Sequence, residues 1–221
     1  MTALKEIGEI GISDGRTGGC DYLLRPSFGA MVRLGEPEEI VNLFALIHGS
    51  EAQQFLETCG GVFHHIPAWV SPTLNAMSSR LLSAAVRVVQ ACCDDDLSAI
   101  TGEWKGWKRY VVYRPGLMPR EDIVIIARQL LLHGIIGQAK VRRLQRHESS
   151  NTTNEFRAFD YISAARSHFG MSRDEAARLT MTEFQFLLAA KYPDQKGFTR
   201  EEYDAVADDY LVRKARKMAK E

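Results

Sequence analysis

The sequence predicts a mainly α-helical protein with a small β-hairpin near its start. Three observations support this fold class. Apolar residues recur at intervals of three and four over most of the chain, which is the period of an amphipathic helix. Two short apolar-rich runs near the start flank a segment that contains three glycines, the pattern of a hairpin. A polar segment at 147–155 separates a larger helical part from a smaller one.

The hairpin is expected to join short strands near 7–12 and 22–24 through a turn at 13–19. Glycines in that turn can supply the positive φ angles that tight turns require. The remainder of the larger part is mostly helical, because prolines suited to first helical turns and glycines suited to helix ends bracket the apolar patterns. Its helices are expected at 26–35, 37–49, 53–58, 72–93 and 119–137.

The segment between the last two of these helices is expected to hold one strand. Tyr110–Tyr113 is an aromatic and β-branched run, which favours a strand. Two tryptophans, Trp104 and Trp107, come just before it and flank Lys105-Gly106, which we interpret as a turn.

The polar segment predicts two domains joined by a linker. We expect a helical N-terminal domain with short strands at 1–146, a linker at 147–155, and a C-terminal module of three or four helices at 156–221. Helix starts in the module are marked by S/T-x-x-E capping boxes, in which a hydroxyl and a glutamate satisfy backbone N–H groups reciprocally. The boxes are Ser172 with Glu175, Thr180 with Glu183, and Thr199 with Glu202.

Charge and hydropathy argue against several classes of partner. Lysine plus arginine and aspartate plus glutamate number 28 each, whereas a nucleic-acid-binding protein normally has a basic surplus. The most apolar stretch, Ile123–Ile136, is interrupted by polar residues and is shorter than the ~20 residues of a membrane span. The start lacks the pattern of a signal peptide, and four cysteines without a disulfide framework suit a reducing compartment. We therefore expect a cytoplasmic protein that binds neither nucleic acid nor membrane.

Motifs for chemistry are missing from the sequence. It has no G-x-S-x-G, P-loop, G-x-G-x-x-G, C-x-x-C or H-E-x-x-H motif. His64 and His65, near Cys59, could act as metal ligands with either Cys92 and Cys93 or the run Asp94–Asp96 as partners, but the spacing matches no zinc site. The aspartates are also suited to the end of a helix and the start of a solvated loop. We predict no catalytic residue, no cofactor and no metal, and hence a protein that is not an enzyme.

Aromatic residues outside the apolar stripes are the candidates for binding a protein partner. Phe186 lies two positions after Phe184 and so on the opposite side of a predicted helix. Trp104 and Trp107 lie among charged residues. Exposed aromatic side chains are typical anchors in protein interfaces. The alternative is that each of the three packs under a neighbouring loop or the other module.

Five segments resemble tail assembly chaperones of long-tailed bacteriophages and prophages. They are LRPSFGAM at 24–31, GEPEEIV at 35–41, FDYISAA at 159–165, GMS at 170–172 and TMTEF at 180–184. The resemblance covers both predicted domains, and the first two segments are similar to the opening of these proteins. The region from Trp104 to Pro115 matches no motif of the family.

The resemblance implies a function in building a phage tail. Such a chaperone binds the tape-measure protein, a long helical chain with apolar faces, and the tail-tube protein. It acts in the cytoplasm of the bacterial host and is absent from the mature virion. In the family a short form is the first module, and a longer form, often made by a translational frameshift, carries both; this chain resembles the long form. Two alternatives remain: a structural tail component or adaptor retained in the virion, and a metal-dependent enzyme that uses His64 and His65.

Overall fold

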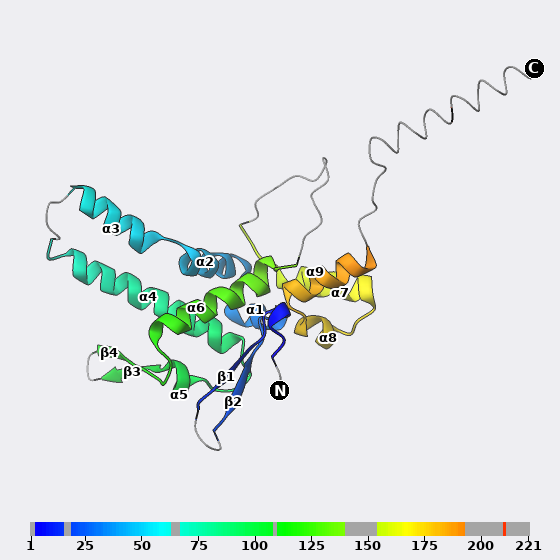
Figure 1. Ribbon diagram of the computed structural model, residues 1–221, viewed down its shortest axis with the longest axis horizontal. Helices are drawn as coiled ribbons and strands as arrows, with labels where there is room; N and C mark the ends of the chain where they lie inside the picture. Colours follow the sequence, from blue (N-terminus) through cyan, green and yellow to red (C-terminus); the bar gives the residue numbers. More distant parts are fainter. Residues whose placement is uncertain are drawn as a thin grey trace, which may run out of the picture. The chain divides into compact units, whose positions relative to one another are not determined.

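The structure is a computed structural model, and it confirms the mainly helical fold with small antiparallel strand pairs (Figure 1). It describes residues 3–15, 19–62, 67–107, 110–139, 154–192 and 210. The chain divides into two compact units, residues 1–187 and 188–221. The contacts and sites discussed below belong to the first unit.

The elements follow the order expected from the sequence, with an additional strand and an additional short helix between the last two helices predicted for the larger part. The strands are β1 (Ile10–Ser13), β2 (Asp21–Leu24), β3 (Glu103–Trp107) and β4 (Tyr110–Arg114). The α-helices are α1 (Phe28–Leu34), α2 (Pro37–His48), α3 (Glu51–Val62), α4 (Val70–Ala91), α5 (Ser98–Thr101), α6 (Arg120–Leu131), α7 (Ala158–Phe169), α8 (Arg173–Arg178) and α9 (Met181–Lys191). A 3-10 turn, η1 (Lys5–Ile7), precedes β1, and a π-helical turn, η2 (Leu132–Ile136), follows α6.

The predicted N-terminal hairpin is confirmed. β1 and β2 are antiparallel, with Ile10 opposite Leu24 and Ser13 opposite Asp21. Leu24 is completely buried, so the end of β2 is part of the core. Ser27 then caps α1 by accepting a hydrogen bond from the backbone N–H of Ala30 at 3.1 Å, which explains why this helix begins directly after the strand.

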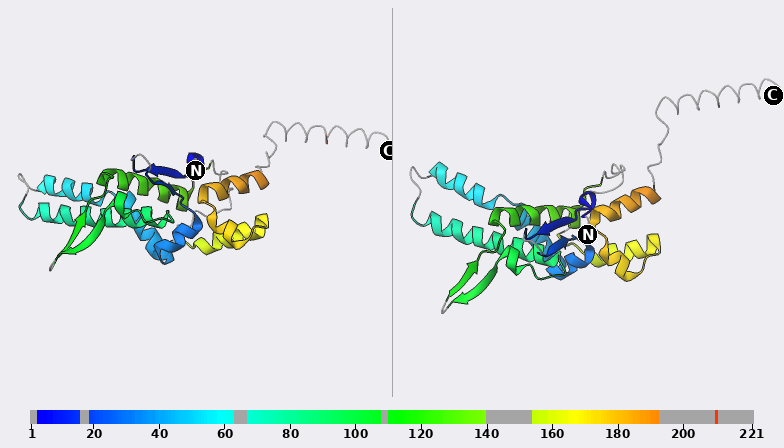
Figure 2. Two further views of the ribbon diagram at one scale, coloured as in Figure 1. Left: turned by 90° about the horizontal axis from the view of Figure 1, so that it is seen from below. Right: turned by 60° about the horizontal axis from the view of Figure 1, so that its bottom comes forward.

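The core of the first unit lies where α4 packs against α6 and α2, with α1 beside them. Figures 1 and 2 show α3 running alongside the first half of α4. The largest fully buried side chains are Phe28, Leu24, Met31, Leu34, Ile40, Ile47, Leu97, Ile123, Leu130, Leu131, Val70 and Val88. Burial of these apolar side chains is the main contribution that holds the helices together.

The interpretation of Lys105-Gly106 as a turn is wrong, because both residues lie within β3. β3 pairs with β4, with Trp104 opposite Tyr113 and Gly106 opposite Val111. Lys105 and Gly106 have low strand preference, although the tryptophans on either side favour a strand, and pairing with the β-branched residues of β4 extends the strand through all five residues. The structure therefore contains a second hairpin where the sequence predicts a single strand.

Helices α7 and α8 pack against α1, and aromatic residues of α7 and α9 complete the core around Phe28. The ring of Phe28 lies 5.5 Å from that of Tyr161 in α7 and 5.9 Å from that of Phe184 in α9, measured between ring centroids. Pairs at these separations add to the stability that burial provides. The predicted domain boundary at 147–155 stays a prediction, because only residues 154 and 155 of that segment are described.

Two of the three capping boxes lie in the described residues, and both form. Ser172 accepts from the N–H of Glu175 at 3.2 Å, and Glu175 accepts from the N–H of Ser172 at 2.9 Å. Thr180 and Glu183 make the same exchange at 3.1 and 3.4 Å. The third box, Thr199 with Glu202, lies outside the described residues.

None of the described helices combines the length and the apolar character that a membrane span requires.

Candidate functional site

The β3–β4 hairpin exposes apolar side chains on both of its faces. Val111 is 70% exposed, Val112 47% and Trp104 38%. Paired residues share a face and neighbours along a strand alternate, so Trp104 and Val111 lie on one face and Val112 on the other. Figures 1 and 2 show the hairpin extending away from the helices. Few of its side chains are therefore covered by the rest of the unit.

The base of this hairpin is held by Tyr113. Its hydroxyl donates a hydrogen bond to the backbone carbonyl of Thr101. The guanidinium of Arg120 lies 5.0 Å from the centre of the Tyr113 ring, and the Trp104 ring lies 5.0 Å away. Burial raises the pKa of the Tyr113 hydroxyl, while the charge of Arg120 opposes that change. The hydroxyl thus stays protonated and able to donate.

Backbone contacts below Tyr113 fix the hairpin further. The N–H of Met118 donates to the carbonyl of Ile100 at 2.9 Å. Gly102 has a φ of 82°, and a side chain at Gly116 would collide with the carbonyl oxygen of Ile100. The base is therefore closely packed, whereas the strands beyond it are open.

The other candidate residues are not brought together with this hairpin. Phe186 lies on α9 and is 47% exposed, whereas Phe184 on the same helix is buried, as their spacing predicts. The backbone of Trp107 ends β3, but its side chain lies outside the part of the structure that is described. Trp104 is part of β3 and Phe186 is part of α9, and Figure 1 shows these two elements apart from each other.

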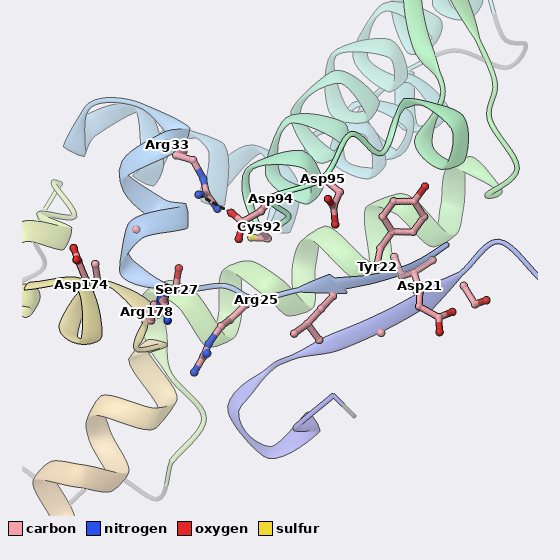
Figure 3. A pocket seen from close by; sticks show the side chains of 16 residues that line it. Asp21, Tyr22, Arg25, Ser27, Arg33, Cys92, Asp94, Asp95, Asp174 and Arg178 are labelled. Atoms are coloured by element: carbon pink, nitrogen blue, oxygen red, sulfur yellow. Dashed lines mark hydrogen bonds and ion pairs between the residues drawn. The ribbon is translucent and has the colours of Figure 1, made fainter. Parts of the chain in front are cut away.

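A cavity of about 780 Å³ lies beside β2 and is a second candidate site (Figure 3). It is bounded by β1, β2, α1, α8 and the loop that follows α4. Its lining includes Tyr22, Arg25, Arg33, Asp95 and Arg178. Cavities of this size commonly hold ligands or peptide segments.

Arg25, at one side of the cavity, joins the N-terminal hairpin to the start of α9. Its Nε lies 3.2 Å from a carboxylate oxygen of Glu9, and its Nη2 lies 3.2 Å from one of Glu183. Glu9 is buried and also accepts a hydrogen bond from the backbone N–H of Leu4 at 3.0 Å. The charge of Arg25 is therefore already neutralised by two carboxylates.

Arg33 occupies another side of the cavity and closes the end of α4. It donates two hydrogen bonds to the carbonyl of Ala91, at 2.9 and 2.7 Å, and one to Asp94 at 3.1 Å. The neighbouring thiol of Cys92 is buried, and burial raises its pKa to about 12. Cys92 is thus a protonated core thiol in the folded protein, which does not suit a nucleophile or a metal ligand.

The outer edge of β2 faces this cavity. The N–H of Asp14 donates to the carbonyl of Cys20 at 3.4 Å, so even-numbered residues of β2 bond to β1 and odd-numbered ones point outward. The N–H of Arg25 donates to the carbonyl of Cys92 at 2.7 Å, in agreement with this alternation. The N–H and C=O groups of Asp21 and Leu23 therefore point to the outer side.

Among the residues that line this cavity, the sequence suggests a role only for Cys92, Asp94 and Asp95, as possible partners of His64 and His65 in a metal site. Arg25 lies in the segment 24–31 without an assigned role, and Asp21 belongs to no local motif. The outward direction of a strand edge depends on the register of the hairpin, which the sequence does not specify by itself.

The metal hypothesis is not tested at its main residues, since His64 and His65 lie outside the described residues. Among the residues that are described, no group of three or more His, Cys, Asp or Glu side chains could hold a metal ion.

Comparison with known proteins places the chain in one family. No curated protein and no solved structure matches the sequence. A family model matches residues 24–205, which begin within β2 and extend beyond α9. The chain therefore belongs to the family described as "Family of unknown function (DUF6246)".

Proposed function

We propose that the protein acts by binding other proteins, as a tail assembly chaperone for tape-measure and tail-tube proteins during phage tail assembly. The observation that supports this most directly is the β3–β4 hairpin, which exposes Trp104, Val111 and Val112. Exposed apolar clusters on a protein surface commonly mark interaction sites.

The geometry of the hairpin favours a partner over a purely structural role. A two-stranded hairpin alone is only marginally stable in water, and this one is fixed mainly at its base. Docking against a partner would bury Val111 and the Trp104 ring on one face. The apolar face of a helical tape-measure protein would supply a complementary surface. Binding to the hairpin would also keep the apolar face of the tape-measure protein from aggregating.

Phe186 supplies a second, separate surface for the same function. It is exposed on α9 while Phe184 of that helix packs into the core. Two separate surfaces would allow one chain to bind two partners. We propose that the hairpin and Phe186 are the two contacts, with the protein acting in the host cytoplasm and leaving before the virion is complete.

The test is co-expression with the tape-measure and tube proteins encoded beside the gene, followed by affinity capture. We expect the wild-type chain to retain at least one of them. A variant with Val111→Ser and Val112→Ser should retain the tape-measure protein about tenfold less, since lost interface apolar contacts of this size cost about 1 to 2 kcal/mol.

Ile125→Ser is the matched control, because Ile125 is also an exposed aliphatic residue but lies on α6. It should bind as wild type does. Failure of the wild-type chain to retain either protein would reject the proposed function. Equal losses for the hairpin variant and for Ile125→Ser would reject the hairpin as the site. Stoichiometric amounts in purified virions would favour the structural-component alternative.

A further inference from the structure

We infer that the outer edge of β2 binds an extended, basic segment of a partner protein, which adds to the β1–β2 hairpin as a third strand. The inference concerns a different surface from the β3–β4 hairpin and does not depend on the proposed phage function. It is based on the direction of backbone groups, on the cavity beside them and on the charges that surround it.

The first step is the unpaired backbone of β2. The N–H and C=O groups of Asp21 and Leu23 point outward, and no described residue forms a hydrogen bond with them. Such an edge is a template for another strand. The next outward group along the chain, the N–H of Arg25, already bonds to the carbonyl of Cys92 at 2.7 Å. Within the described part of the chain, the outward backbone groups of β2 therefore have a hydrogen-bond partner at Arg25 and none at Asp21 or Leu23.

The second step is the space beside this edge. The cavity of about 780 Å³ is lined by Asp21, Tyr22 and Leu23 on one side and by Asp94 and Asp95 on the other (Figure 3). An added strand would lie about 4.8 Å from β2, within the cavity. Since the bond from Arg25 to Cys92 closes one end, the partner segment would pair with Asp21 and Leu23 and continue toward the β1–β2 turn.

The third step is the sign of the charge that the side chains lining the cavity leave beside the edge of β2. Ion pairs neutralise Arg25 and Arg33, the cations nearest the edge. Among the described ion pairs none involves the carboxylates of Asp21 or Asp95. Arg178 lies at the other end of the cavity, beside Asp174 (Figure 3).

The environment of Tyr22 agrees with a negative potential at the end of the cavity that lies beside β2. Burial raises the pKa of its hydroxyl, and the neighbouring Cys20, Asp14 and Asp95 raise it further. A partner with lysine or arginine side chains would therefore be favoured over an acidic one. Two copies of this edge would bring the carboxylates of both chains together, which disfavours pairing of the protein with itself.

The test uses a short synthetic peptide of alternating lysine and valine as the probe, labelled with a fluorophore for binding by anisotropy. We expect saturable binding to the full chain, and slower hydrogen exchange at the amide of Leu23, which a bound strand would protect. A peptide with glutamate in place of lysine should bind about tenfold more weakly, because exposed charge pairs each contribute modestly to binding and the glutamates would be repelled by Asp21 and Asp95.

Two N-methylated versions of the lysine peptide separate strand pairing from simple charge attraction. Methyl groups on the amides that face β2 should abolish binding, whereas methyl groups on the alternate amides should not. Equal binding of both versions would overturn the inference, as would protection of amides elsewhere. Absence of binding by the lysine peptide would also overturn it.

Variants of the protein test whether the carboxylates beside β2 are the ones that attract the peptide. The double change Asp21→Asn and Asp95→Asn should weaken peptide binding about tenfold through loss of two favourable charge pairs. Asp174→Asn removes the same kind of charge at the other end of the cavity and should leave binding unchanged. An equal effect of Asp174→Asn would overturn the inference, because binding would then depend on net charge and not on the edge of β2. Self-association of the free chain that protects Leu23 would identify a second copy as the occupant and overturn the inference.

Discussion

The two hairpins of this protein differ in what covers them. The β1–β2 hairpin ends in the fully buried Leu24 and is joined to the rest of the unit by Arg25, which contacts two carboxylates. The β3–β4 hairpin is held at its base by Tyr113 and exposes Val111 and Val112 beyond it. The first hairpin thus contributes to the stability of the fold. The second has its apolar side chains available for another molecule.

The largest effect should come from removing the core anchor of the first hairpin. Leu24→Ala creates a cavity in a closely packed region, since Leu24 is completely buried. We expect a loss of about 3 kcal/mol in the free energy of unfolding, measured by urea denaturation. A loss below about 1 kcal/mol would show that the hairpin is not anchored through this residue.

The second effect concerns the charge that joins the hairpin to α9. Arg25→Ala leaves the buried carboxylate of Glu9 without its cation, and we expect a loss of about 2 kcal/mol, reduced from the fully buried case because Arg25 is partly exposed. Adding Glu9→Gln should recover part of the loss.

In the other hairpin, Lys105→Ala breaks an exposed ion pair with Glu103 and should cost less than about 0.5 kcal/mol.

A smaller effect should appear with pH at His133, which lies against Gly8 in the segment leading to β1. Its Nδ1 lies 2.8 Å from the hydroxyl of Thr182, and burial lowers its pKa below the ordinary value of 6.5. As the pH falls through about 6.5, the unfolded chain binds a proton before the folded protein does, so stability decreases until the folded pKa is passed.

We therefore expect the free energy of unfolding to be lower at about pH 5.5 than at about pH 7.5. Urea unfolding of the wild type and of His133→Gln at both pH values checks it, and the difference between them should be smaller in the variant. Burial also lowers the pKa of His48, so part of the dependence should remain in His133→Gln. An unchanged pH dependence in the variant would contradict the assignment to His133.

The smallest effect on stability should follow a change in the second hairpin. Val111→Ser replaces a side chain that is mostly in water, so the free energy of unfolding should change by less than about 0.5 kcal/mol. The same variant should still lose partner binding under the proposed function. A large loss of stability would mean that Val111 packs within the unit and would remove the contrast between the hairpins.

The features that local chemistry determines could be predicted from the sequence. The capping boxes at Ser172 and Thr180 form as their spacing indicates, and the turn glycines correctly indicate the first hairpin. Phe186 is exposed and Phe184 is buried, as helical periodicity requires. Each of these predictions depends on residues that are a few positions apart.

Features that depend on distant residues could not be predicted. The ion pair of Arg25 with Glu183 and the packing of Phe28 on Tyr161 join segments far apart in the chain. Lys105-Gly106 has the composition of a turn, and it is the pairing with β4 that places both residues inside strand β3. The cavity beside β2 has walls from several elements, so no local pattern indicates it.

The contacts of Phe28 have a consequence for synthesis on the ribosome. Phe28 emerges early, but Tyr161 and Phe184, which cover it, emerge much later. Until then an apolar ring that would bury roughly 150–250 Å² remains in contact with water, and the nascent chain is open to aggregation or to cellular folding helpers. A product terminated within 147–155 would retain this exposed surface permanently. The full chain and such a shorter product would therefore share residues 1–146 but differ at Phe28, which is covered in the first and exposed in the second.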